Sequence, residues 1–169
     1  LKSKIVIPRE VDSDNFVTSY QWLDKSYKEC RPSFYALWVC TTCGYADFPE
    51  YFEKYLESPT HDFAKLRDII LEKTADKNGV LFKLLSTIDL NGPEIEFETA
   101  MNIHLLAIYC HDYLLQDNDD YEKLGRLYLR TSWLFREYQL LGLQEKPFAG
   151  HASYWAYLDS LKGQWPTIP

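Results

Sequence analysis

Two cysteines separated by two residues are the clearest chemical feature of this sequence: Cys40 and Cys43, followed at once by Gly44. Such a pair can hold a metal ion between two thiolates, or can cycle between a dithiol and a disulfide. A metal knuckle needs a tight turn between the thiols and then a residue that tolerates a left-handed backbone. The C-x2-C-G pattern after the extended run "FYALWV" meets that description.

A redox pair of the thioredoxin type needs a different setting. Its first thiol lies at a helix N-terminus, where the helix dipole lowers the thiol pKa. Here the next helix is expected to begin at Pro49, too far along the chain to activate Cys40. The pattern therefore favours a zinc knuckle, with a pair that releases zinc or oxidises as the alternative.

The remaining zinc ligands are not evident, because a structural zinc ion takes four and this pair supplies two. Cys30 is a candidate third ligand across a hairpin, and His61 a candidate fourth. Each has a plainer interpretation, Cys30 as an isolated thiol near a turn and His61 as a solvated residue in a first helical turn. Leu1 is not a natural start, so we expect a segment upstream and zinc in the full-length protein rather than on this chain alone. Cys110 lies on an apolar helical stripe and is assigned to the core.

A second candidate site lies on one predicted helix and contains Arg126, Arg130, Trp133 and Arg136. Guanidinium groups bind carboxylates in a forked geometry, and tryptophan offers a stacking face, so these are candidate partner-binding residues. The alternative is a salt-bridged helix surface with Trp133 in the core, and the charge pattern favours it.

The sequence gives little support for other metal sites or for catalytic motifs. His104 and His111 lie on one predicted helix without further ligands and are interpreted as ordinary residues. The stretch "DNDDYE" lacks the central glycine and the final acid of a calcium loop, so it predicts helix capping. The sequence contains no glycine-rich phosphate loop, nucleophile elbow or zinc-protease motif, and we expect no enzyme activity.

Composition limits the classes of partner. The 169 residues carry a net charge of −7, which disfavours nucleic acid and anionic membranes. The longest apolar runs fall well short of the roughly 20 residues that span a bilayer, and we expect a cytoplasmic, reducing setting. Aromatic residues make up 16%, which suits tight helix packing or a surface that binds a protein or peptide partner.

The chain divides into residues 1–48, which lean towards β-structure, and residues 49–169, which are helical throughout. The first part contains "KIVI" and "FYALWVC", separated by the turn "DSDN". In the second part, apolar spacing, caps and breakers predict helices that begin at Pro49, after Ser58–Pro59, and after Gly79, and then over residues 95–115, 119–142 and 148–162. "DLNGP" is a loop, Asp119 and Glu122 form a capping box, and Gly142 ends its helix.

These elements predict a mainly α fold, either an antiparallel helical bundle or tetratricopeptide-like hairpins, with a small N-terminal β element like a zinc ribbon. The tetratricopeptide opening is matched at four positions: Tyr121, Leu124, Gly125 and Tyr128. However, Glu137 stands where the template has alanine, nothing breaks the helix near Thr131, and no second copy precedes it. We therefore do not expect a tandem array.

Two phrases resemble a known family. "PSFYALWVCTTCGYADF", followed far downstream by "GRLYLRTSWLFRE", resembles the bacterial family called domain of unknown function 2225, and the likeness covers most of the chain in order. The resemblance implies a zinc-ribbon-like segment with two C-x2-C pairs, followed by tetratricopeptide-like helices. It implies architecture and no established activity.

The correspondence can be followed residue by residue. Cys40 and Cys43 correspond to the second cysteine pair of the family, so residues 1–48 resemble half of a zinc ribbon whose other half lies upstream of Leu1. The matching residues are Gly44, Tyr45, Ala46 and Phe48 after that pair, and Leu127, Tyr128, Leu129, Arg130, Trp133, Leu134, Arg136 and Glu137 in the helical phrase. Thr41 replaces a usual proline, Phe135 replaces a frequent tyrosine, and the first cysteine pair is absent.

The sequence therefore predicts a non-enzymatic helical interaction module with a zinc-knuckle-like N-terminal element, which binds a protein or peptide partner. The alternative is a zinc- or redox-responsive sensor that uses the thiols of Cys40 and Cys43.

Overall fold

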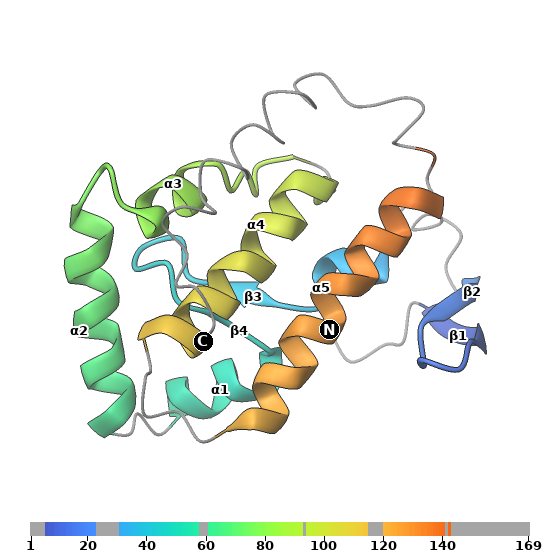
Figure 1. Ribbon diagram of the computed structural model, residues 1–169, viewed down its shortest axis with the longest axis horizontal. Helices are drawn as coiled ribbons and strands as arrows, with labels where there is room; N and C mark the ends of the chain where they lie inside the picture. Colours follow the sequence, from blue (N-terminus) through green and yellow to red (C-terminus); the bar gives the residue numbers. More distant parts are fainter. Residues whose placement is uncertain are drawn as a thin grey trace. The chain divides into compact units, whose positions relative to one another are not determined.

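The computed structural model describes residues 6–22, 31–57, 61–92, 94–114, 120–140 and 142 (Figure 1). The chain forms two compact units, Leu1–Pro32 and Ser33–Pro169. The predicted helix over residues 148–162 and the Ser58–Pro59 cap lie outside the described residues.

The first unit contains one antiparallel hairpin, made of β1 (Val6–Val11) and β2 (Val17–Trp22). The expected turn "DSDN" connects the strands. The Asp12 carboxylate accepts hydrogen bonds from the backbone N–H groups of Asp14 and Phe16, and Asn15 has a positive φ of 59°. Short polar residues of this kind stabilise turns by bonding to the backbone two residues ahead.

The second unit is mainly helical, with one further small antiparallel sheet. The sheet consists of β3 (Trp38–Val39) and β4 (Ala46–Asp47), after a 3₁₀ turn at Pro32–Tyr35. The helices are α1 (Pro49–Glu57), α2 (His61–Ala75), α3 (Val80–Ser86), α4 (Phe97–Ile108) and α5 (Tyr121–Leu140). The mainly α prediction is therefore confirmed, whereas "FYALWVC" forms a strand only at its Trp38–Val39 end.

Helix ends follow the local signals closely. Pro49 occupies the first position of α1, and Gly79 is the N-cap of α3. The cap of α5 is Asp120, whose Oδ1 accepts a hydrogen bond of 2.9 Å from the Lys123 N–H, while the expected Asp119 lies outside the described residues. Gly142 follows α5 with a φ of +64°, as expected for a helix stop.

The two long helices α4 and α5 pack side by side and run in opposite directions (Figure 1). The predicted stripe on α4 is buried, including Ile103, Leu106 and Cys110. The helix predicted over residues 95–115 is not uniform, however, since Tyr109–Leu114 forms a π-helical turn. Such turns are rare and have no simple sequence signature.

The β3–β4 hairpin is part of the helical core. Leu37, Tyr45 and Ala46 are buried in the same apolar cluster as Leu81 and Leu84 of α3. The compact unit that contains this hairpin spans Ser33–Pro169. A two-stranded hairpin buries little apolar surface alone and is stabilised by the helices that cover it.

Within the described residues, no helix is long and apolar enough to cross a membrane.

Candidate functional site

The cysteine pair lies on the tight turn between β3 and β4. The Cys40 N–H donates to the Tyr45 carbonyl at 2.8 Å, and the Gly44 N–H donates to the Cys40 carbonyl at 2.7 Å. Gly44 has a φ of +82°, which is the left-handed conformation that the C-x2-C-G pattern predicted.

The space around Gly44 is also tight. A Cβ on Gly44 would lie 3.0 Å from the Leu81 Cδ2 of α3. The turn also contacts α2: the Thr74 hydroxyl donates to the Ile70 carbonyl of its own helix at 2.7 Å and lies 3.3 Å from the Cys43 carbonyl. The backbone that carries the thiols is therefore packed against both α2 and α3.

The two thiols are half-buried and interact with each other. Burial raises the pKa of Cys40, but hydrogen bonds from the backbone and side chains of Thr42 and Cys43 outweigh it and lower that pKa overall. Burial raises the pKa of Cys43. Backbone N–H groups directed at the first sulfur suit a thiolate that binds a metal ion. α1 begins only at Pro49, so Cys40 is not at a helix N-terminus, as the sequence predicted.

The pair provides two of the four ligands that a structural zinc ion takes. Among the described residues, no group of three or more His, Cys, Asp or Glu side chains could hold a metal ion. Cys30 lies outside the described residues, and His61 is the first residue of α2, where only the backbone is described. Cys110 is fully buried with its Sγ 3.9 Å from the Gly44 carbonyl, and burial raises its pKa to about 12, so it is a core thiol as predicted.

The arginine-rich stretch of α5 does not form one continuous clamp. Arg126 donates to Glu50 of α1 at 2.7 Å, and its guanidinium lies 4.2 Å from the Phe48 ring centre. The Arg130 guanidinium stacks 4.4 Å from the Trp133 ring centre, but Trp133 itself is buried. Arg136 is half-buried further along α5. The structure thus brings Arg130 and Trp133 together and directs Arg126 to α1.

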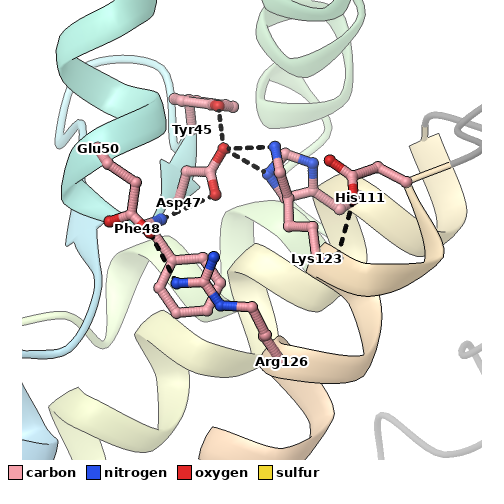
Figure 2. A network of polar contacts seen from close by, with 8 residues as sticks. Tyr45, Asp47, Phe48, Glu50, His111, Lys123 and Arg126 are labelled. Carbon is pink, nitrogen blue, oxygen red and sulfur yellow. Dashed lines mark hydrogen bonds and ion pairs between the residues drawn. The ribbon is translucent and has the colours of Figure 1, made fainter.

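A buried polar network lies beneath α1 and centres on Asp47, which has no exposed surface (Figure 2). Its Oδ2 accepts hydrogen bonds from the Tyr45 hydroxyl at 2.6 Å and from the Lys123 Nζ at 3.1 Å, and lies 3.2 Å from the His111 Nε2. Its Oδ1 accepts from the Phe48 N–H at 2.8 Å, at the start of α1. The π-helical turn carries His111 to this carboxylate.

The groups around Asp47 stabilise its charged form. Burial raises the pKa of Asp47, but His111, Lys123 and the Tyr45 hydroxyl together lower it below its ordinary value. The Lys123 Nζ also lies 3.9 Å from the Tyr51 ring centre. Because Asp47, His111 and Lys123 are all buried, the arrangement connects β4, the π-helical turn and α5 rather than exposing reactive groups to a substrate.

Sequence reasoning missed this network, although one signal for it existed. Lys123 occupies the same helical stripe as Leu127, Leu134 and Tyr138, all of which are buried. A charged residue on an apolar stripe indicates a buried partner. His111 was interpreted as an ordinary residue, and no pattern placed it beside Asp47.

An apolar cavity of about 280 Å³ opens beside β3; we call it the Trp38 groove. Trp38 is 43% exposed and packs edge-on against Phe52 of α1, with 6.0 Å between ring centres. The Tyr35 hydroxyl accepts a hydrogen bond of 3.0 Å from the Ile95 N–H, which connects two sides of the groove. The lining side chains are all apolar or aromatic: Tyr35, Leu37, Trp38, Val39, Phe52, Leu90, Ile95 and Ile103.

Fold and site together define a mainly helical protein in which a small cysteine-bearing hairpin is packed into the helical core and borders an apolar groove. The chain belongs to the family described as "Uncharacterized protein conserved in bacteria", domain of unknown function 2225, whose sequence profile matches residues 14–161. The family resemblance of the two sequence phrases is thereby confirmed. No curated protein and no solved structure matches the sequence.

Proposed function

We propose that this protein is a non-enzymatic interaction module that binds a protein or peptide partner through the Trp38 groove. The observation that supports the proposal is a half-exposed tryptophan at the edge of an apolar cavity. Buried aromatic anchors in apolar pockets supply most of the affinity in protein interfaces. Tyr35 and Leu90, also lining residues, are similarly exposed and would be covered with Trp38 when a partner binds.

The size and chemistry of the groove support binding rather than catalysis. Its volume of about 280 Å³ is just below the range of roughly 300–1,000 Å³ for small-molecule sites, which suits one or two apolar side chains. Among the described residues, no carboxylate, amine or imidazole lines the groove. The one hydroxyl among these lining side chains belongs to Tyr35, and it accepts a hydrogen bond from the Ile95 N–H.

Zinc is the second part of the proposal. Cys40 and Cys43 would provide two thiolate ligands, and the other two would come from outside the described residues. The metal would cross-link the turn that directly follows Trp38 and Val39, so it would stabilise one wall of the groove. Zinc here would have a structural role, since two thiolates on a fixed turn suit a closed site.

Peptide selection tests the groove. Random peptides would be selected on the intact protein, and their affinities would be compared between the natural chain, Trp38→Ala and Tyr121→Ala. Tyr121 is a matched control, because it is 75% exposed and belongs to α5 rather than to the groove. We expect Trp38→Ala to weaken binding by about tenfold or more and Tyr121→Ala to leave it unchanged. Peptides that bind Trp38→Ala as tightly as the natural chain would overturn the assignment.

Metal analysis tests the zinc ligands. The protein should carry about one zinc ion per chain, which Cys40→Ser and Cys43→Ser should each remove. Cys110→Ala is the matched control, since it removes a buried thiol that is not a ligand. Equal zinc content in all four proteins would contradict the proposed site.

A sensor is the second candidate function, and the position of Cys40 and Cys43 on one tight turn, where the Gly44 N–H donates to the Cys40 carbonyl, favours it. A hydroperoxide would accept two electrons and two protons from the thiols, giving a disulfide, water and an alcohol. Mass spectrometry after brief peroxide treatment should then show loss of two hydrogens from the peptide that contains both cysteines. If these thiols are modified no faster than those of the unfolded chain, the sensor is excluded.

A further inference from the structure

The loop and helix start on one side of the Trp38 groove are strongly acidic. Leu90 and Ile95 line the groove, and Asp89, Glu94 and Glu96 directly adjoin them in the sequence. These three acidic residues are exposed, and a fourth acid, Glu98, follows in the first turn of α4. The groove is therefore apolar inside, and the segment that forms one of its edges carries exposed negative charges.

These carboxylates are not neutralised by cations of the described chain. None of the ion pairs identified between described residues, such as those of Arg67 with Asp68 and of Arg126 with Glu50, includes Asp89, Glu94 or Glu96. The Asp89 carboxylate instead accepts hydrogen bonds from the backbone N–H and the side-chain amide of Asn91. A negative edge without internal counter-charges attracts cations from another molecule.

We propose, on the basis of the interaction function above, that the natural partner presents a bulky apolar side chain flanked by lysine or arginine residues. The apolar side chain would enter the groove beside Trp38, and the flanking cations would lie against Glu94 and Glu96. Charge complementarity favours such a segment over an acidic one. A second copy of this chain is disfavoured for the same reason, since each copy has a net charge of −7.

The probes are two synthetic fluorescent peptides with the same central Leu-Trp pair. One has two lysines on each side of the pair, and the other has two glutamates on each side. Binding would be followed by fluorescence polarisation with the natural chain, Trp38→Ala and the double variant Glu94→Lys/Glu96→Lys. The matched control is Glu72→Lys/Glu122→Lys, which changes the net charge equally at exposed positions on α2 and α5.

We expect the natural chain to bind the lysine peptide about tenfold or more tightly than the glutamate peptide at low salt. Glu94→Lys/Glu96→Lys should lower the affinity for the lysine peptide by about tenfold, because each charge reversal replaces an attraction with a repulsion. The same variant should bind the glutamate peptide more tightly than the natural chain does. The difference should shrink in about 0.5 M salt, where the charges are screened. The Glu72→Lys/Glu122→Lys control should change either affinity by less than about twofold.

The other outcomes separate this inference from the function on which it rests. If both peptides bind equally well and Trp38→Ala abolishes both, the groove is confirmed and the basic partner is wrong. If both double variants weaken the lysine peptide equally, the attraction comes from net charge, and the inference is overturned. If Trp38→Ala changes neither affinity, the groove itself is not the binding site. A dimer that sedimentation detects and Trp38→Ala dissociates would replace the peptide partner with a second copy.

Discussion

His104 is expected to make the protein less stable in mild acid. Its side chain is 1% exposed in α4, and its Nδ1 lies 2.8 Å from the Ala100 carbonyl oxygen. Its Nε2 has no hydrogen-bond partner among the described residues. Burial lowers the pKa of His104, the Ala100 carbonyl opposes this, and the charge of Arg130 lowers it further, to about 4.

The direction and size of the effect follow from this pKa. The unfolded chain takes up a proton at His104 below pH 6.5, whereas the folded protein does not until about pH 4. The free energy of unfolding should therefore fall as the pH drops from 6.5 towards 4, and this contribution should level off below that. At about 1.4 kcal/mol for each pKa unit, the full loss from His104 is about 3.5 kcal/mol, of which about 3 kcal/mol is reached by pH 4.

Urea denaturation at closely spaced pH values between about 4 and 7.5 would measure this loss. His104→Gln is the informative variant, because it keeps a polar side chain of similar size that does not titrate. The readout is the change in the free energy of unfolding with pH, which is independent of any offset that the substitution causes near neutral pH. The difference between the two curves should grow by about 3 kcal/mol in favour of the variant on acidification.

The reasoning is refuted if His104→Gln shows the same pH dependence as the natural chain. A direct check is nuclear magnetic resonance titration of the His104 ring in the folded protein. An ordinary midpoint near 6.5 would show that the imidazole is solvated when charged, contrary to the buried position described.

Three further perturbations test the packing around the cysteine turn. Lys123→Met should lower the free energy of unfolding by about 3–5 kcal/mol, because it removes a cation from the buried Asp47 carboxylate. The double variant Asp47→Asn/Lys123→Met should lose less than the two single variants added together, because it leaves no buried charge without a partner. Because the pKa of Asp47 is lowered, the contribution of its carboxylate to the free energy of unfolding should be lost only as the pH falls below about 4. Chemical denaturation would measure the stability of each variant and its change with pH. Gly44→Ala should destabilise the fold by about 1–2 kcal/mol or more, since φ is +82° and the new Cβ meets Leu81; an unchanged melting temperature would contradict the turn geometry. Arg126→Ala should cost no more than about 1 kcal/mol, because its ion pair with Glu50 is largely exposed; a larger loss in the same melt would show that its packing on Phe48 matters more than its charge.

Local chemistry made much of the helical architecture predictable. Pro49 begins α1, Gly79 precedes α3 and Gly142 ends α5, because proline and glycine limit or extend the backbone angles of their own residues. The turn at Gly44 was predictable for the same reason. The apolar stripe containing Cys110 identified the buried face of α4, since helical periodicity alone decides which side chains share a face.

Contacts between segments that are distant in the sequence could not be predicted from local backbone preferences or helical periodicity. Asp47, His111 and Lys123 come from three separate stretches, and His111 reaches the carboxylate through a π-helical turn that no local pattern predicted. Burial of the hairpin among the helices likewise depends on how α3 and β4 meet, and so does the boundary of the compact unit at Ser33.

Of the two candidate sites, local sequence predicted the cysteine turn, whereas the Trp38 groove depends on tertiary packing. The spacing and the following glycine specified the cysteine turn, because a turn is formed by residues that are neighbours in the chain. The Trp38 groove was foreseen only as an aromatic surface of unknown position. Its walls come from β3, α1, α4 and the loop at Leu90, so it exists only when these segments pack together. Trp133, a candidate contact residue for which the charge pattern favoured a core position, is buried, since the packing of α5 covers its ring.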